Sequence, residues 1–96
     1  MRNILPRNEF KRDFRRALKG RYRNLLAKDG EFDRIKEKLA NDEPLEFSYR
    51  DHALHHNWEG CRECHIKSDF LLVYSYDGED WLILERLGTH SDIFGL

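Results

Sequence analysis

The segment CRECH, residues 61–65, combines two thiols with an imidazole in five positions. The spacing Cys-x-x-Cys-His is the pattern of a c-type haem attachment site. Two thiolates and an imidazole are also ligands that zinc prefers. A third interpretation is a β-strand that carries a histidine on one face. The three interpretations imply three different classes of protein.

Haem attachment requires an exported protein, and the N-terminal residues MRNILPRNEF show neither an apolar segment nor a small-residue cleavage site. We therefore expect a cytoplasmic protein with reduced thiols and no cofactor. A zinc-binding Cys-x-x-Cys lies on a tight turn, so that both sulfurs converge on the metal. The residues around CRECH are typical of a strand instead, where positions three apart face opposite ways. Cys61 and Cys64 are thus expected to diverge rather than to bind one metal together, which leaves open a site built from one cysteine, His65 and the upstream histidines.

The strand interpretation places Glu63 and His65 side by side on one face, which makes both candidates for chemistry. Two further histidines are candidates as well. His52 lies in a region without a clear period, and His90 follows the glycine at position 88 near the C-terminus.

The elements that must position these side chains follow from apolar periodicity. Apolar residues recur at helical spacing from Phe10 to Leu26, and again from Phe32 to Leu39. Later runs rich in β-branched, aromatic and apolar residues are separated by turn-forming residues and predict strands. The expected helices span about 8–28 and 31–41, and the expected strands about 2–6, 60–66, 70–76 and 81–87. This order predicts an α+β fold, a small antiparallel sheet packed against two N-terminal helices, in one domain of residues 1–96.

The connection between the second and third predicted strands decides whether His65 and Asp69 share a face. If these two residues pair directly, the connection has three residues, Ile66 to Ser68. A two-residue turn at Lys67 and Ser68 would pair Ile66 with Asp69 and place His65 on the opposite face. A site that uses both side chains therefore predicts a three-residue loop or a β-bulge here.

Charge is unevenly distributed along the chain. Residues 1–38 hold 13 Lys and Arg against 6 Asp and Glu, whereas residues 39–96 hold 4 against 12. The first predicted helix has a strongly basic outer face, which indicates either an anionic partner or an ordinary solvated helix surface. No stretch approaches the roughly 18 apolar residues of a membrane span, so no membrane partner is expected.

The C-terminal half contains motifs at fixed spacings, in the segment RDHALHHNWEGCRECHIKSDFLLVYSYDGEDWLILERLGTHSDIFG. These motifs are DHAL, a W-x-G-x-R-x-x-H strand, an acidic residue that opens the next strand, ERLGTH and a terminal Phe-Gly. Over about residues 44–95 the series resembles the YafQ branch of the RelE/ParE-like toxins, the ribonuclease components of type II toxin–antitoxin modules. The two basic helices agree with that family in position and character.

The resemblance implies a small sheet packed on two N-terminal helices, and cleavage of mRNA in the ribosomal A site without a metal. It also implies neutralisation by a cognate antitoxin of the DinJ/RelB type. The residues at the family's active-site positions are His52, His65, Asp69, His90 and Phe94. A further family position, an aspartate two residues before the strand histidine, is Glu63 here, which keeps the charge and places it one methylene group further out.

Cleavage of RNA by its own 2′-hydroxyl gives these residue types separate tasks. The reaction needs a base for the 2′ proton, an acid for the leaving 5′ oxygen and positive charge near the phosphorane. Histidine suits both proton transfers because it titrates near neutral pH. We expect His90 to be the general acid. His65 and His52 are expected as base or phosphate-stabilising imidazoles, and Asp69 as the carboxylate that orients a histidine or takes part in proton transfer.

Substrate contacts are expected from three further residues. Arg86 can grip a phosphate through two hydrogen bonds, Phe94 can stack on a nucleobase, and Glu63 lies beside His65. The basic helix face is expected to contact the phosphates of ribosomal RNA through Lys11, Arg12, Arg15, Arg16, Lys19 and Arg23.

Two alternatives belong to other classes of protein. The same superfamily includes members that poison DNA gyrase, and such a protein would bind its target without needing three histidines near one cleft. A small zinc protein would use Cys61, Cys64, His65 and one more histidine, and would contain about one equivalent of zinc.

Overall fold

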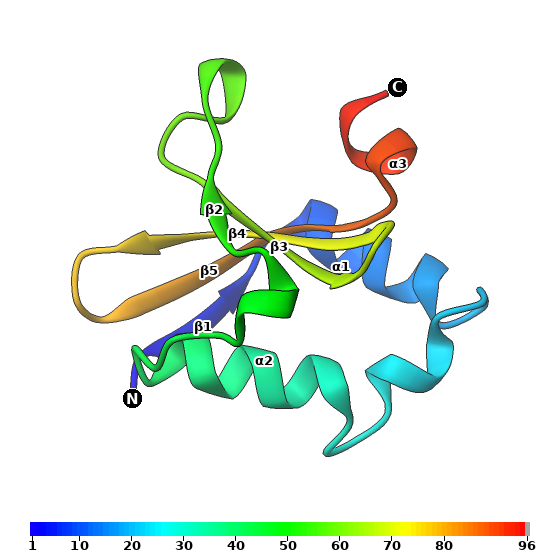
Figure 1. Ribbon diagram of the computed structural model, residues 1–96, viewed down its shortest axis with the longest axis horizontal. Helices are drawn as coiled ribbons and strands as arrows, with labels where there is room; N and C mark the ends of the chain where they lie inside the picture. Colours follow the sequence, from blue (N-terminus) through cyan, green and yellow to red (C-terminus); the bar gives the residue numbers. More distant parts are fainter. Residues whose placement is uncertain (96) are drawn as a thin grey trace.

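A mixed five-stranded sheet forms the centre of the computed structural model, which describes residues 1–95 (Figure 1). In the spatial order β1-β5-β4-β3-β2, its strands are β1 Asn3–Pro6, β5 Trp81–Gly88, β4 Phe70–Asp77, β3 Arg62–Lys67 and β2 His52–Ala53. β3, β4 and β5 form an antiparallel meander, and β2 extends it at the β3 edge. The predicted α+β class is confirmed.

Two features of the sheet differ from the expectation. β1 pairs with β5 in parallel, with Ile4 opposite Leu82. The helices that follow β1 carry the chain across one face before the meander begins, and parallel strands need such a crossover. β2 was not among the predicted strands, because two residues show no detectable period and the strand exists only through its pairing with β3.

The first helix is shorter than predicted. α1 spans Asn8–Ala17 rather than about 8–28, and a turn then leads into a short 3₁₀ helix. Leu18 is 46% exposed, so the apolar repeat does not continue a buried helix face there. Tyr22 reaches the core from the turn and stacks on Phe70, with 4.6 Å between ring centroids. Apolar spacing alone does not distinguish this irregular segment from a continued helix.

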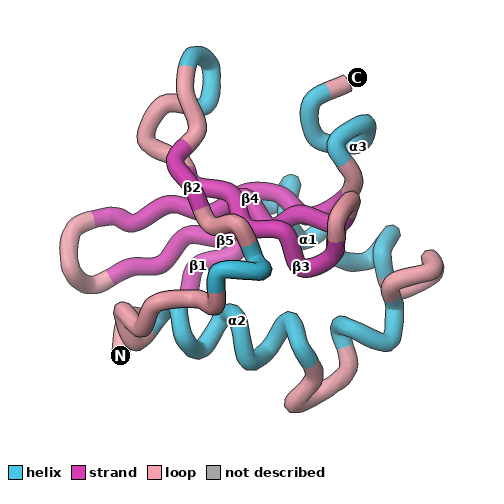
Figure 2. Tube along the Cα trace, in the orientation of Figure 1, coloured by secondary structure: helices cyan, strands magenta, loops and turns pink. Residues whose placement is uncertain are grey.

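The main core lies between the helices and one face of the sheet. α2 spans Glu31–Ala40 and packs with α1 against this face (Figure 2). Phe10 of α1, Phe32 of α2 and Leu72 of β4 are buried there together, and removing such apolar surface from water stabilises the layers. Within residues 1–95, no helix combines the length and apolar composition needed to cross a bilayer.

The opposite face of the sheet carries a smaller apolar cluster. Leu71 and Val73 of β4 pack there against Ile93 of α3, a short helix at His90–Phe94. α3 and the loop that follows β2 both rise from this face, on either side of β3 and β4 (Figure 1). Side chains on this face therefore lie between segments that are far apart in the sequence.

Candidate functional site

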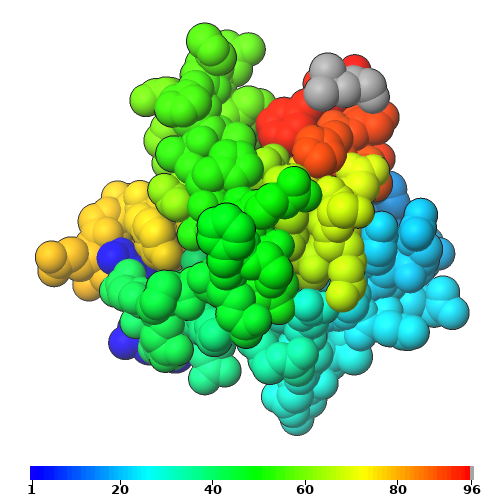
Figure 3. Space-filling model, in the orientation of Figure 1, coloured from blue at the N-terminus to red at the C-terminus, as the bar shows by residue number. Residues whose placement is uncertain are grey.

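Three histidines from three different elements lie together on this second face. His52 is on β2, His65 is on β3 and His90 opens α3. The ring centroids of His52 and His65 are 5.9 Å apart, and those of His65 and His90 are 5.6 Å apart. In Figure 3 the green, yellow and orange-red segments that carry them adjoin one another. The structure thus brings together the histidines selected from the sequence.

Glu63 lies between two of these histidines and is only 4% exposed. The β2–β3 register places His52 opposite Glu63, and the alternation of side chains along β3 puts Glu63 and His65 on one face. The carboxylate oxygen Oε2 is 3.0 Å from Nε2 of His52 and 3.3 Å from Nε2 of His65. Within residues 1–95, the other oxygen, Oε1, is buried without a hydrogen-bond partner. The two histidines offset the cost of burying this carboxylate.

Both ring nitrogens of His52 face an oxygen acceptor. Its Nδ1 is 2.6 Å from the carbonyl oxygen of Arg50, which can only accept, and its Nε2 faces a carboxylate oxygen of Glu63. Both contacts are satisfied when His52 carries two ring protons, or when Glu63 is protonated and donates to Nε2.

Arg50 contacts both histidines of this cluster and is a residue that the sequence analysis missed. Its Nη2 is 3.2 Å from Nδ1 of His65, while its carbonyl oxygen accepts from His52. Its backbone is left-handed, with φ 46° and ψ 47°, a conformation that costs a residue with a Cβ atom about 1 kcal/mol. Its position two residues before His52 is the sequence feature that could have indicated a role for Arg50, but that position alone does not distinguish it from other exposed arginines.

Asp51 anchors this strained segment to the sheet. Its Oδ1 accepts a hydrogen bond of 2.5 Å from the Tyr74 hydroxyl and is 3.4 Å from Nε of Arg62. Burial and the hydrogen bond to Asp51 raise the pKa of Tyr74 well above its ordinary value of 10.0. The Tyr74 hydroxyl therefore keeps its proton and donates it at neutral pH. Because Asp51 lies between Arg50 and His52 in the sequence, its hydrogen bond with Tyr74 restrains the backbone of both residues.

The turn between β3 and β4 differs in detail from the predicted connection. Its two residues are Ser68 and Asp69, His65 pairs with Leu71, and the register shifts between His65 and Lys67. The structure thus contains the β-bulge that was one of the two expected solutions, but His65 does not pair directly with Asp69. Asp69 faces α3 instead.

Asp69 holds His90 through two hydrogen bonds. Its Oδ1 accepts from Nδ1 of the ring at 2.7 Å and from the backbone N–H of His90 at 3.0 Å. Thr89 and Asp92 form a capping box that starts α3 and so places His90 in its first turn. The His90 side chain is 41% exposed. Among residues 1–95, no hydrogen-bond partner contacts its Nε2.

The contacts with His90 lower the pKa of Asp69 below its ordinary 3.8, the backbone hydrogen bond contributing most and the ring hydrogen bond next. A lowered pKa stabilises the folded state above pH 3.8, and this contribution is lost as the pH falls through the lowered value. We expect the Asp69 carboxyl signal in ¹³C NMR to titrate below 3.8. In His90→Ala, which keeps the backbone N–H, the midpoint should rise part of the way back. An unchanged midpoint would show that the ring does not contribute.

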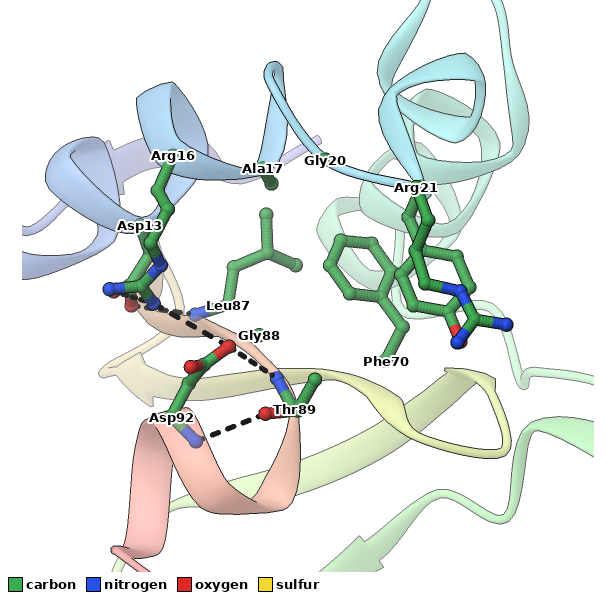
Figure 4. A pocket seen from close by; sticks show the side chains of 11 residues that line it. Asp13, Arg16, Ala17, Gly20, Arg21, Phe70, Leu87, Gly88, Thr89 and Asp92 are labelled. Carbon is green, nitrogen blue, oxygen red and sulfur yellow. Dashed lines mark hydrogen bonds and ion pairs between the residues drawn. The ribbon is translucent and has the colours of Figure 1, made fainter.

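Arg86, a predicted phosphate contact, is held by Asp13 of α1. Its Nε and Nη2 donate to the two carboxylate oxygens at 2.7 and 3.3 Å, and these hydrogen bonds raise the pKa of the Arg86 guanidinium. Asp13 is 3% exposed and also accepts from the Leu87 backbone N–H and from Arg16 (Figure 4). Arg86 holds α1 against β5, and its contact with substrate stays a prediction.

The other predicted contacts surround the histidines. The Phe94 ring is 6.3 Å from His90 between centroids and meets Trp58 edge-on at 5.5 Å. The six basic residues predicted to contact RNA are exposed on α1 and the segment after it. One of them, Arg16, approaches Asp92 of α3 at 3.8 Å, which connects the basic surface with the helix of His90. Contact of these residues with RNA stays a prediction.

A metal could be held by a different set of residues from the cysteine motif. Cys64 is fully buried in the main core, whereas Cys61 packs on the other face of the sheet, so the proposed cysteine site is not assembled. His52, Glu63 and His65 each offer one ligand atom, and these atoms lie within 4.8 Å of one another. Two imidazoles and one carboxylate form a ligand set found at catalytic zinc sites.

Comparison with known proteins identifies the family of the chain. The family model described as bacterial toxin of type II toxin-antitoxin system, YafQ, matches residues 2–95. The mRNA interferase toxin YafQ of Escherichia coli K12 is 40% identical over 57 residues, which cover 59% of this chain and 61% of that protein. The chain spans 55–61% of the length of the curated relatives that it matches.

Solved structures extend the likeness over nearly the whole chain. A copper-bound mutant toxin from Helicobacter pylori has a TM-score of 0.86 at 37% identity, covering 98% of this chain and 100% of that one. The E. coli DinJ–YafQ complex has a TM-score of 0.79 at 30% identity, covering 99% of this chain and 100% of that one. Because the family model matches almost every residue, the chain belongs to the YafQ family of bacterial toxins of type II toxin–antitoxin systems.

Proposed function

We propose that this toxin is an endoribonuclease that cleaves ribosome-bound mRNA by histidine acid–base catalysis, without a metal. The observation that carries the proposal is the state of His90, whose Nδ1 is held by Asp69 while its Nε2 has no partner among residues 1–95. An imidazole that is oriented by a carboxylate and open at its other nitrogen is suited to exchange a proton with a substrate. The name of the E. coli relative, mRNA interferase toxin, supports mRNA as the substrate.

In the proposed reaction, the 2′ oxygen forms a bond to the adjacent phosphorus while the bond from phosphorus to the 5′ oxygen breaks. The products are a 2′,3′-cyclic phosphate and a 5′-hydroxyl. His90 gives its Nε2 proton to the leaving 5′ oxygen, and Asp69 stabilises the imidazolium that precedes this transfer. The 5′ oxygen therefore leaves as a neutral hydroxyl.

The proton of the 2′-hydroxyl passes into the cluster of His52, Glu63 and His65. His52 is the member open to substrate, because its side chain is 49% exposed. The Glu63 carboxylate is 3.0 Å from Nε2 of His52, so it stabilises the imidazolium that His52 becomes when it takes the 2′ proton. The protonated cluster then offers positive charge to the phosphorane.

The basic surface supplies the proposed contact with ribosomal RNA. Its residues on α1 are exposed, and neutralisation of phosphates by such side chains is the main source of affinity for nucleic acids. Arg21, between α1 and the 3₁₀ helix, lies close enough to Asp69 to help lower the pKa of that carboxyl. Positive charge therefore extends from α1 to the histidines, where Phe94 would stack on a nucleobase.

A cognate antitoxin is the proposed protein partner, and the cytoplasm, where translation occurs, is the proposed compartment. The E. coli DinJ–YafQ complex supports the first of these, because its structure shares the fold of this chain. An antitoxin segment that packs against the helices or the sheet would block or distort the histidine site.

Metal binding is proposed as an inhibitory property of the same cluster. A toxin of this fold from H. pylori is copper-bound, and His52, Glu63 and His65 fit a divalent ion because of their donor types and mutual distances. A bound ion would act as a Lewis acid. It would also occupy the ring nitrogens and the carboxylate that the proposed proton transfers need.

Cleavage mapping by primer extension on translating ribosomes tests the proposed function. With EDTA-treated protein, we expect cuts at in-frame codon positions on ribosomes and none on the same message without ribosomes. Added zinc is expected to reduce these cuts, because it competes with protons for the histidines. Cuts that require zinc would replace proton transfer by a metal-dependent mechanism, and a wild-type protein that makes no cuts would contradict the ribonuclease proposal.

A further inference from the structure

Arg50 differs from Arg62 and Arg86, which are each held by an aspartate. Arg62 pairs with Asp51, and Arg86 pairs with Asp13. Arg50 is exposed and forms no ion pair within residues 1–95; its guanidinium contacts a histidine ring nitrogen instead. A guanidinium without a carboxylate partner is suited to an anionic ligand, since it presents several N–H donors in one plane.

The Nδ1 nitrogen of His65 has both a donor and an acceptor as neighbours. The guanidinium of Arg50 is 3.2 Å away and can only donate, which requires Nδ1 to be unprotonated. The carbonyl oxygen of Ser68 is 3.3 Å away and can only accept, which requires a proton on Nδ1. The positive charge of Arg50 opposes a proton on Nδ1 and so favours the tautomer that is protonated at Nε2, which faces Glu63 at 3.3 Å.

A polar cavity of about 280 Å³ adjoins these two side chains. Its lining includes Arg50, His65 and Lys67. The Lys67 ammonium is paired with Glu31 at 3.2 Å, so the unpaired positive charge of this cavity is that of Arg50. The cavity offers room for a phosphate group beside a histidine of the site.

The backbone of Arg50 is held in place on both sides. Its N–H donates to the Phe47 carbonyl at 3.0 Å, and its own carbonyl accepts from His52. The next residue, Asp51, is bound by the Tyr74 hydroxyl. A left-handed backbone maintained by surrounding contacts is a feature of functional sites, and here it aims the long side chain of Arg50 at His65.

We propose that Arg50 binds a non-bridging oxygen of the scissile phosphodiester and, before substrate binds, holds His65 in its Nε2–H tautomer. The inference rests on the proposed function, because it names the group that binds the phosphate in that reaction. When the guanidinium turns to the phosphate, Nδ1 of His65 loses this donor and keeps the Ser68 carbonyl as its neighbour.

The first test is ¹H–¹⁵N NMR of the histidine rings in the free protein, which requires no activity. In the wild type, Nδ1 of His65 should give the signal of an unprotonated nitrogen. In Arg50→Ala, the signal should change to that of a protonated nitrogen. Arg34→Ala removes an exposed arginine of α2 and, as the matched control, should leave the signal unchanged. A protonated Nδ1 in the wild type would overturn the tautomer assignment.

The second test is single-turnover cleavage on programmed ribosomes, with a phosphorothioate at the mapped cut. Arg50→Ala should lower the rate about 100-fold, and Arg50→Lys should recover part of the loss. The wild type should cleave one phosphorothioate diastereomer more slowly than the other, and Arg50→Ala should cleave both at equal rates, because the contact that distinguishes the two oxygens is absent. The same diastereomer ratio in both proteins would overturn the phosphate contact.

The two tests separate this inference from the proposed function. A wild-type protein that does not cleave would remove the phosphate role together with the ribonuclease proposal, whereas the nitrogen signals would still decide whether Arg50 sets the tautomer of His65. A wild-type protein that cleaves, with Arg50→Ala equally fast, would overturn the role of Arg50 alone.

Discussion

Replacing His90 with alanine is expected to lower the rate of mRNA cleavage on ribosomes about 1000-fold, because the change removes the proposed general acid for the leaving oxygen. The fold should survive the change. The side chain is 41% exposed, and its ring bonds to a single residue, Asp69, within residues 1–95. The backbone N–H that also bonds to Asp69 remains in the variant.

Single-turnover cleavage measures this loss, and thermal unfolding followed by circular dichroism reports on the fold. His55→Ala is the matched control, because His55 is a histidine with a 74% exposed side chain outside the cluster; it should cleave at the wild-type rate. A His90→Ala protein as fast as wild type would contradict the role of His90. A variant that still arrests growth without cutting mRNA would favour a toxin that acts by binding, as the gyrase-poisoning members of the superfamily do.

Replacing Asp13 with alanine is expected to lower the free energy of unfolding by about 3–5 kcal/mol, the cost of removing one partner from a buried ion pair. Asp13 is 3% exposed and accepts hydrogen bonds from Arg86 and from the backbone N–H of Leu87. Without it, the Arg86 guanidinium and a buried backbone donor lose their partner. The end of β5 that lies beyond its pairing with β1 would also lose its hydrogen bonds to Asp13 of α1.

Urea unfolding followed by tryptophan fluorescence measures this effect. Arg16→Ala is the matched control, because Arg16 contacts the same carboxylate from a side chain that is 53% exposed; it should cost less than about 1 kcal/mol. An Asp13→Ala protein as stable as Arg16→Ala would show that the ion pair with Arg86 does not hold α1 in place.

Local sequence patterns predicted much of the fold but failed at its irregular parts. The strand alternation that puts Glu63 beside His65 depends only on neighbouring residues, and it separates the two cysteines as expected. The end of α1 at Ala17 was missed, because Tyr22 continues the apolar spacing of the helix while reaching the core from a turn. Periodicity reports which residues are buried, and it does not report the backbone path that buries them.

The candidate site shows the same division. Its three histidines could be selected as candidates from their residue type, from their places in the expected elements and from the resemblance to a toxin family. The sequence predicted a three-residue loop or a β-bulge that would bring Asp69 to the face of His65; the register shift is present, but Asp69 contacts His90 instead. Arg50 escaped attention because its importance comes from a left-handed backbone and a contact with a residue fifteen positions away.

The sequence by itself determines which main segments are helices or strands, which side chains share a face of β3, and that α1 is basic. Each of these features depends only on residues that are close together in the sequence. The tertiary structure decides which of these side chains meet. His52 reaches Glu63 only through the pairing of β2 with β3, and His90 reaches Asp69 only because α3 folds back over β4. Such contacts depend on strand register and on packing between distant segments, for which no local pattern exists.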